Sequence, residues 1–176
     1  RYCEPIYLEY IDKLAELNPD VVGFTLYYTN EEATKWFVTQ LKQKLPNTKF
    51  IVGGPQANSP KKDTIDLFDY VVQGEGEKIL LDVLDSIEQK QKLPRKILIQ
   101  PKTERLNLDE MPFPDFSDFD FSKYIMPNGT SSEVSRGCVA KCVFCTEVHF
   151  WKYRGRRAGT IVDEVEHQDR KSTRLN

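Results

Sequence analysis

The stretch Lys49-Phe50-Ile51-Val52-Gly53-Gly54-Pro55 decides the fold of the first half of the chain. An apolar run that ends abruptly in two glycines and a proline is typical of a strand buried on both faces of a parallel sheet and followed by a tight turn. Similar runs stand on either side of it. Val21-Val22-Gly23-Phe24-Thr25-Leu26-Tyr27 precedes it, and Tyr70-Val71-Val72, which leads into Gly74-Glu75-Gly76, follows it.

Helical patterns separate these predicted strands. In residues 5–17, Tyr7, Ile11 and Leu14 share one helical stripe. Thr29 followed by Glu32 forms a capping-box pattern that opens a second helix. Residues 63–68 and 77–89 suggest a short helix and an amphipathic one. Alternating strands and helices predict an α/β fold with a doubly wound parallel sheet.

The composition excludes several classes of protein. The 176 residues carry 25 Lys and Arg against 27 Asp and Glu, a net charge of −2, and 39% are hydrophobic. This is typical of a soluble globular chain, and no basic excess is available to neutralise nucleic-acid phosphates. No apolar run is long enough for a membrane span, and no signal-peptide pattern opens the chain. We therefore expect a cytoplasmic protein that does not bind nucleic acid.

Three loops follow the predicted strands: residues 25–30, Gly53-Gly54-Pro55 and Gly74-Glu75-Gly76. The carboxyl ends of parallel strands meet at one sheet edge, where doubly wound folds bind ligands, so these loops predict a binding face. The alternative is that they are ordinary strand-to-helix turns. A nicotinamide site is disfavoured, because Gly74-Glu75-Gly76 lacks a third glycine and carries acidic side chains.

The second half has a different character. Residues 108–121 are rich in Pro, Asp and Phe, which favours an ordered linker whose phenylalanines pack on a surface, with a disordered tail as the alternative. Residues 132–135 predict a strand and residues 160–167 a helix. Arg154, Arg156 and Arg157 are either an anion-binding cluster or a solvated basic stretch.

Residues 19–89 resemble the cobalamin-binding domain that precedes radical S-adenosylmethionine (SAM) enzymes. The resemblance rests on the runs that begin at Asp20, Val52 and Asp69 and end in the three loops. It implies cobalamin contacts from Thr25, Tyr27, Gly53, Gly54, Pro55, Gly74 and Glu75. The D-x-H-x-x-G element, which supplies a histidine to cobalt in some relatives, is not in this sequence.

Cys138, Cys142 and Cys145 have the spacing C-x-x-x-C-x-x-C. Three thiolates leave one iron of a [4Fe–4S] cluster free to bind another molecule. The spacing resembles the radical SAM signature, which implies that the three cysteines hold a cluster, that SAM binds its open iron, and that reductive cleavage releases a 5′-deoxyadenosyl radical. By the same resemblance, Phe144 packs near the adenine of SAM.

Two other interpretations remain open. His149 completes a Cys₃His set with the three cysteines, and such sets bind structural zinc, so the chain can also be a non-catalytic metal-binding module. A third interpretation is a cobalamin sensor without chemistry. The resemblance to cobalamin-dependent radical SAM enzymes implies methyl transfer or oxidative cyclisation on a small-molecule substrate. It also implies an electron donor such as ferredoxin or flavodoxin.

These observations predict four segments. Residues 1–92 form an N-terminally truncated cobalamin-binding-like domain, and residues 93–130 form the linker. Residues 131–169 supply the first strand, cluster loop and helix of an incomplete radical SAM (β/α) barrel. Residues 170–176 resemble translated sequencing-adapter sequence and are interpreted as a non-native tail. The sequence is thus expected to be a fragment of a longer enzyme.

Overall fold

The computed structural model describes residues 4–101, 104–124, 129–140, 142–145 and 151–172. The chain divides into two compact units, Arg1–Arg105 and Leu106–Asn176. In the described part of the chain, no helix combines the length and apolar character that crossing a bilayer requires.

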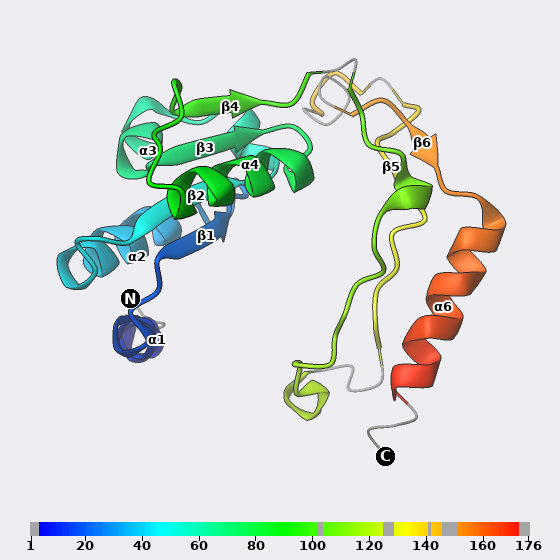
Figure 1. Ribbon diagram of the computed structural model, residues 1–176, viewed down its shortest axis with the longest axis horizontal. Helices are drawn as coiled ribbons and strands as arrows, with labels where there is room; N and C mark the ends of the chain where they lie inside the picture. The colour runs from blue at the N-terminus through cyan, green and yellow to red at the C-terminus, as the bar shows by residue number, and fades with distance from the viewer. Residues whose placement is uncertain (1–3, 102–103, 125–128, 141, 146–150, 173–176) are drawn as a thin grey trace. The chain divides into compact units, whose positions relative to one another are not determined.

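Unit 1 is built on a four-stranded parallel sheet whose strands lie side by side in chain order (Figure 1). The strands are β1 (Val21–Thr25), β2 (Lys49–Gly53), β3 (Tyr70–Gln73) and β4 (Ile97–Ile99). Val21 pairs with Lys49, Ile51 with Tyr70 and Val71 with Ile97. The predicted α/β fold with a parallel sheet is confirmed.

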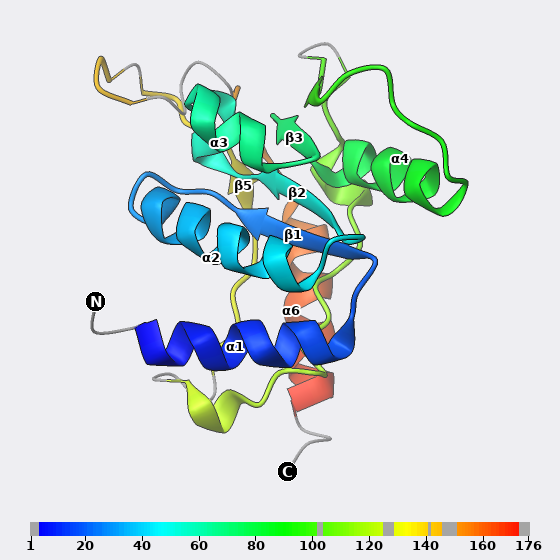
Figure 2. The same cartoon turned by 90° about the vertical axis from the view of Figure 1, so that its left-hand side faces the viewer.

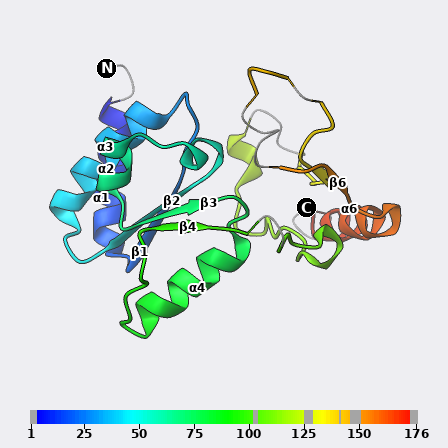
Figure 3. The ribbon, with the colours of Figure 1, turned by 90° about the horizontal axis from the view of Figure 1, so that it is seen from above.

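Helices cover both faces of this sheet. They are α1 (Glu4–Leu17), α2 (Glu31–Lys44), α3 (Lys62–Leu67) and α4 (Glu77–Glu88). Figure 3 shows α2 and α3 on one face and α4 on the other. Helix α1 runs beside α2 (Figure 2), and the ring of Tyr7 lies 6.2 Å from that of Trp36 and 6.1 Å from that of Phe37.

Each face of the sheet has its own hydrophobic core. Under α2 and α3 the buried side chains include Leu26, Val38, Leu41, Phe50, Val52, Phe68 and Val71. Under α4 they are Ile51, Tyr70, Val72 and Val83. Neighbouring residues of β2 contribute to opposite cores, which explains why its sequence is apolar without alternation. Burial of each large apolar side chain stabilises the unit by roughly 1.5–3 kcal/mol.

Strand β4 carries unit 1 past the predicted boundary at residue 92. The backbone N–H of Val71 donates to the carbonyl of Lys96 (2.9 Å), and the N–H of Gln100 donates to that of Gln73 (3.0 Å). Ile97 and Leu98 pack against the two cores. The short apolar run in the predicted linker therefore belongs to the sheet.

The start of α2 differs from the predicted capping box. The residue before the helix is Asn30, not Thr29, and its side chain makes no capping hydrogen bond. Its Oδ1 accepts from the N–H of Tyr27 (2.8 Å), and its Nδ2 donates to the carbonyl of Thr25 (3.0 Å). Asn30 thus holds the loop after β1.

In the described part of unit 2 there are one antiparallel strand pair and one long helix. Strands β5 (Ser135–Arg136) and β6 (Arg154–Gly155) pair with each other, and α6 spans Ala158–Ser172. The predicted helix at 160–167 lies within α6, which continues past the predicted tail boundary at residue 169. The predicted strand at 132–135 overlaps the observed β5 only at Ser135, where β5 begins. The start of a (β/α) barrel stays a prediction.

The Pro- and Phe-rich segment forms two short 3-10 turns, Leu108–Glu110 and Phe121–Lys123. Its aromatic rings contact one another, with centroids 5.8–6.3 Å apart among Phe116, Phe119, Phe121 and Tyr124. Phe113 instead lies 5.6 Å from the ring of His167 on α6. The segment is therefore ordered partly by its own aromatic contacts and partly by contacts within unit 2.

Candidate functional site

The carboxyl ends of β1 to β4 and the loops that follow them form what we call the carboxyl edge. The loops after β1 and β2 are joined by backbone hydrogen bonds. The N–H of Leu26 donates to the carbonyl of Gly53 (2.8 Å), and the N–H of Gln56 donates to the carbonyl of Leu26 (3.0 Å). These bonds bring the predicted loops at residues 25–30 and 53–55 together.

The loop after β3 joins the same strip. Asn58 accepts at Oδ1 from the N–H of Gly74 (2.8 Å), and Gln73 donates from Nε2 to the carbonyl of Ala57 (2.9 Å). Gln100, which follows β4, donates from Nε2 to the carbonyl of Glu104 (2.6 Å). The loops after β1, β2 and β3 thus form one hydrogen-bonded surface, whereas the bond of Gln100 lies within the loop after β4.

Two glycines at this edge have backbone conformations that side chains disfavour. Gly54 has φ +93°, and a Cβ there would lie 2.8 Å from Cγ2 of Thr25 and 3.0 Å from Leu26 backbone atoms. Gly74 has φ +85°, and its Cβ would lie 3.1 Å from Cβ of Gln100. Both glycines are therefore required by the fold itself.

Gly53 has a different role. A Cβ at Gly53 would lie 3.8 Å from the carbonyl oxygen of Val72 and 3.9 Å from its Cβ, which are ordinary contact distances. The protein interior leaves room for a side chain at this position. A requirement for glycine at residue 53 would therefore come from something that approaches the edge from outside.

The other predicted contact residues differ in accessibility. Thr25 and Tyr27 are exposed, and Tyr27 retains 51% of its surface. Pro55 begins the 3-10 turn Pro55–Asn58 at the end of β2. Glu75 is buried, with 3% of its surface exposed. Thr25 and Tyr27 can therefore meet a ligand with their side chains, whereas Glu75 lies inside its loop.

Sequence reasoning missed three residues that organise the carboxyl edge: Asn30, Asn58 and Gln100. Each uses a side-chain amide to bind the backbone of a loop. An asparagine shortly after a strand was a usable signal for Asn30, because asparagine side chains bond nearby backbone in turns. Asn58 has no local signal, since its partner Gly74 lies on another loop.

The three predicted cluster ligands lie in unit 2. Cys138 and Cys142 are exposed, Cys145 is partly exposed, and all three are free thiols. The N–H of Cys145 donates to the carbonyl of Cys142 (3.1 Å), and the N–H of Ala140 lies 3.4 Å from Sγ of Cys138. Among the described residues, no three His, Cys, Asp or Glu side chains are grouped to hold a metal ion, so the thiols are not gathered.

The thiols nevertheless fit an iron–sulfur cluster in their chemistry. Thiolates are the soft ligands that iron–sulfur clusters require, and amide hydrogen bonds to sulfur tune such sites. Gly137, just before Cys138, has φ +85°, and a Cβ there would lie 2.7 Å from the carbonyl of Lys152. Phe144 is 87% exposed. His149, the fourth ligand of the zinc alternative, lies outside the described residues.

The arginines of β6 and the residues after it make internal contacts. Arg154 donates from Nη1 to the carbonyl of Leu106 (2.7 Å). Arg156 pairs with Glu164 of α6, and both side chains are buried. Arg157 donates from its backbone N–H (2.9 Å) and Nε (3.0 Å) to Asp109. Arg154 and Arg156 are thus not a solvated stretch, whereas the side chain of Arg157 is exposed and pairs with Asp109. Together they connect the linker, β6 and α6.

Asp109 shows the electrostatic side of this arrangement. The backbone N–H of Arg157 stabilises its carboxylate, and the guanidinium adds a favourable charge. The pKa of Asp109 therefore lies below its usual value. The Asp-rich linker is anchored to unit 2 as an anion.

A family model described as the B12-binding domain matches residues 3–84 of the chain. This part of the chain is thus similar to the B12-binding domain. The matched region includes β1 to β3, α1 to α3 and most of α4. The carboxyl-edge loops after β1, β2 and β3 thus lie in the region that matches the B12-binding domain.

Relatives with named activities align over both units. The chain is 28% identical to cytidylyl-2-hydroxyethylphosphonate methyltransferase from Streptomyces wedmorensis over 86% of its length. It is 27% identical to anaerobic magnesium-protoporphyrin IX monomethyl ester cyclase from Cereibacter sphaeroides over 88%. It is 31% identical to hopanoid C-3 methylase from Methylococcus capsulatus over 84%. The similarity therefore extends beyond the B12-binding domain into unit 2.

The chain spans 38%, 29% and 31% of the length of these three relatives, respectively. The B12-binding domain and the cysteine loop occupy the aligned part. The relatives are named as methyltransferases and a cyclase, which are enzymes that alter small molecules.

Proposed function

We propose that this chain is the cobalamin-binding and cluster-binding part of a cobalamin-dependent radical SAM enzyme that performs methyl transfer or oxidative cyclisation. One observation carries the proposal: a B12-binding domain is followed in the same chain by three free thiols spaced C-x-x-x-C-x-x-C. The names of the aligned relatives support the two reaction types. Its partners are a small-molecule substrate and an electron donor such as ferredoxin or flavodoxin.

At the carboxyl edge, we assign the backbone of Gly53, Gly54 and Pro55 to close contact with the corrinoid. Thr25 and Tyr27 offer hydroxyl groups on an exposed loop that Asn30 holds in place. The positive φ of Gly74 turns the chain from β3 into the third loop. Glu75 is buried within that loop. Because hydrogen bonds join the loops before any ligand arrives, little ordering entropy is lost on binding.

In unit 2, Cys138, Cys142 and Cys145 would hold a [4Fe–4S] cluster, and Phe144 offers an exposed aromatic face for the adenine of SAM. When bound, the cluster supplies the electron that cleaves SAM. The chain's own residues provide soft ligands and an amide hydrogen bond to sulfur. Since the thiols lie on an exposed turn, the loop must close around the cluster, and Gly137 is the residue whose conformation directs the chain into that loop.

Cobalamin binding is tested with two glycine substitutions. Gly53→Ala fits the protein interior, so we expect its free energy of unfolding to stay within about 1 kcal/mol of the parent. Its methyl group would occupy ligand space, so hydroxocobalamin affinity should fall about tenfold or more. The affinity is measured by titration followed through the visible absorbance of the corrinoid.

Gly23→Ala is the matched control. Gly23 also lies in a strand, and no atom lies within 4 Å of the Cβ that it would gain. It should change neither stability nor affinity. If Gly53→Ala binds hydroxocobalamin as tightly as the parent, the corrinoid is not seated on this glycine.

The cluster assignment is tested by anaerobic reconstitution with iron and sulfide. We expect a brown protein with charge-transfer absorbance that Cys142→Ala abolishes. Cys3→Ala should leave the colour unchanged, because Cys3 lies outside the spaced set. His149→Ala should also leave it unchanged. A colourless protein that retains zinc, and loses it in His149→Ala, would establish the Cys₃His alternative instead.

A further inference from the structure

The opposite edge of the sheet in unit 1 carries a pocket that the proposed function does not use. It lies at the amino ends of the strands, where Lys49 begins β2, Tyr70 begins β3 and Lys96 directly precedes β4. The end of α2 and the connection between α4 and β4 complete its walls. The cavity volume is about 830 Å³, which is within the range of small-molecule sites.

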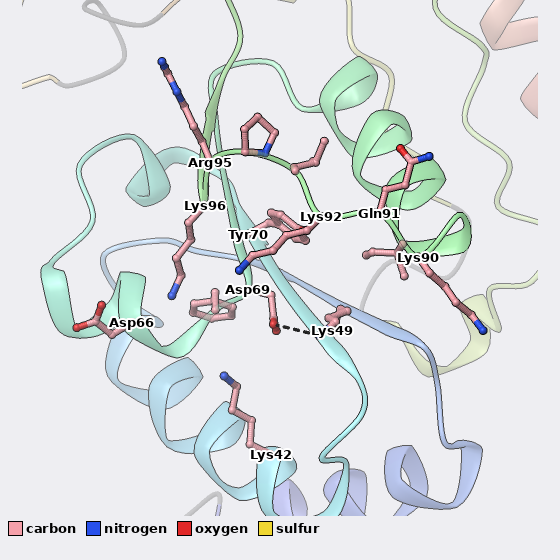
Figure 4. A pocket seen from close by; sticks show the side chains of 14 residues that line it. Lys42, Lys49, Asp66, Asp69, Tyr70, Lys90, Gln91, Lys92, Arg95 and Lys96 are labelled. Carbon is pink, nitrogen blue, oxygen red and sulfur yellow. Dashed lines mark ion pairs between the residues drawn. The ribbon is translucent and has the colours of Figure 1, made fainter.

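The charge of this amino-edge pocket is strongly positive although the whole chain carries −2. Six cationic side chains line it against two acidic ones. Figure 4 shows the side chains of Lys42, Lys92 and Lys96 directed toward the space around Asp69, whereas Lys90 and Arg95 point away. Lys42 lies on α2, Lys49 begins β2, and Lys92 and Lys96 lie on the connection between α4 and β4, so the sheet topology brings three segments together.

Asp69 does not neutralise this group. Its Oδ2 accepts from the backbone N–H of Phe50 (2.9 Å), and its Oδ1 lies 3.7 Å from Nζ of Lys49. The carboxylate of Asp69 thus interacts with the backbone of β2 and with one lysine only among the described residues. No salt bridge is found for Lys42, Lys92 or Lys96 in the described part of the chain.

Helix polarity accounts for only part of the pattern. The carboxyl end of a helix attracts cations, and Lys42 lies in the last turn of α2. Helix α4 has no basic residue in its last turn. Lys92 lies beyond the end of that helix, and Lys96 stands at the entrance to a strand, where no helix dipole requires a charge. Their convergence needs another explanation.

We propose that the amino-edge pocket binds a phosphorylated small molecule that carries at least two negative charges, with Lys42, Lys49, Lys92 and Lys96 as its ligands. Lysine binds phosphate as a mobile point charge, and several lysines on separate elements can surround more than one phosphate group. Buried Phe68 and Tyr70 form a rigid floor. This site is separate from the carboxyl edge, so it does not depend on cobalamin.

The proposal is tested by isothermal titration of the full chain with pyrophosphate, ADP and inorganic phosphate. We expect saturable binding of pyrophosphate and ADP that weakens as ionic strength rises. Equal affinities would identify the phosphates as the determinant, and tighter ADP binding would add a contact to the nucleoside. Both results support the site. The Lys92→Gln, Lys96→Gln double variant should lose affinity about tenfold or more.

The matched control is the double variant Lys61→Gln, Lys62→Gln. It also removes two positive charges, but at the start of α3 and outside the pocket. It should bind within about twofold of the parent, since distant surface charges are screened. Circular dichroism checks that both double variants are folded. Absence of saturable binding, or an equal loss in the two double variants, would overturn the proposal. Hydroxocobalamin titration of the same variants separates this site from the corrinoid site.

Discussion

At the carboxyl edge, Gly54 is the glycine that the fold tolerates least to have replaced. Its positive φ and the contact that a Cβ would make with Thr25 both exclude a side chain. We expect Gly54→Ala to lower the free energy of unfolding of unit 1 by about 2 kcal/mol or more, because strained backbone and a steric clash add together. Urea denaturation monitored by circular dichroism measures the change.

The comparison with Gly53→Ala sharpens this prediction. The two glycines are adjacent, yet the structure excludes a side chain only at Gly54. Gly54→Ala should therefore lose stability, and Gly53→Ala should lose corrinoid affinity with its stability retained. If Gly54→Ala were as stable as Gly53→Ala, the loop would not have the positive φ described for it.

For single residues, the sequence predicts where the functional loops lie better than it predicts which hydrogen bonds hold them. The sequence predicts that the glycine loops after the buried strands share one edge, and the structure places them there. Asn58 was not identified, because its hydrogen bond to Gly74 joins two loops that approach each other only in the folded chain. The roles of Arg154, Arg156 and Arg157 also depend on partners distant in sequence.

Among the elements, α6 is held by an unusually polar contact. Leu108 is the only apolar side chain counted as buried in the described part of unit 2, whereas Glu164 of α6 is 1% exposed. Arg156 pairs with Glu164 and also donates to the carbonyl of Glu133 (3.2 Å). Gln168 donates to the other oxygen of Glu164 (3.3 Å). This buried network fastens α6 to β6.

Replacing Glu164 should therefore loosen α6. Glu164→Gln leaves the guanidinium of Arg156 buried without its counter-charge, which costs about 3 kcal/mol. Hydrogen exchange of the α6 amides should become faster, with the sheet of unit 1 unchanged. Asp163→Asn, an exposed neighbour on the same helix, should exchange at the parent rate. Equal protection in both variants would contradict the role of the pair.

The same pair predicts a dependence on pH. Burial tends to raise the pKa of Glu164, but hydrogen bonds and the charge of Arg156 outweigh it, so the pKa lies below the usual 4.5. A carboxylate with a lowered pKa stabilises the fold above its ordinary pKa, and this contribution is lost as the pH falls through the folded-state value. The protection of the α6 amides from hydrogen exchange should therefore decrease as the pH drops below about 4.5 in the parent, but not in Glu164→Gln.

The elements of unit 1 were predicted well because apolar periodicity and glycine turns are local signals. Helix α1 and strands β1 to β3 follow the predicted ranges closely. Strand β4 lies in the predicted linker, because its flanks are polar and only its pairing with β3 places it in the sheet. Strands β5 and β6 have two residues each, too few for any periodicity to show.

The whole chain divides after Arg105, and truncation tests this boundary against the predicted one. A chain that ends at Arg105 keeps β4 and should retain cooperative unfolding of the sheet. A chain that ends at Lys92 loses β4, its backbone pairing and the burial of Ile97 and Leu98. We expect it to be less stable by about 3 kcal/mol, judged by urea denaturation.

Equal stability of the two truncated chains would mean that β4 contributes nothing to the sheet. Both should be compared with the full chain, because unit 2 contributes no strand to this sheet within the described residues. The result would also fix the shortest protein in which corrinoid binding can be measured.

The chain-order arrangement of the four strands has a consequence for how the protein is made. Each strand pairs with the one synthesised just before it, so no strand must wait for a distant partner. Such sequential pairing keeps the contact order lower than pairing with distant strands would, and a lower contact order speeds folding. The sheet can therefore grow one strand at a time as the chain leaves the ribosome, and the cysteine loop emerges only after β1 to β4 have been synthesised.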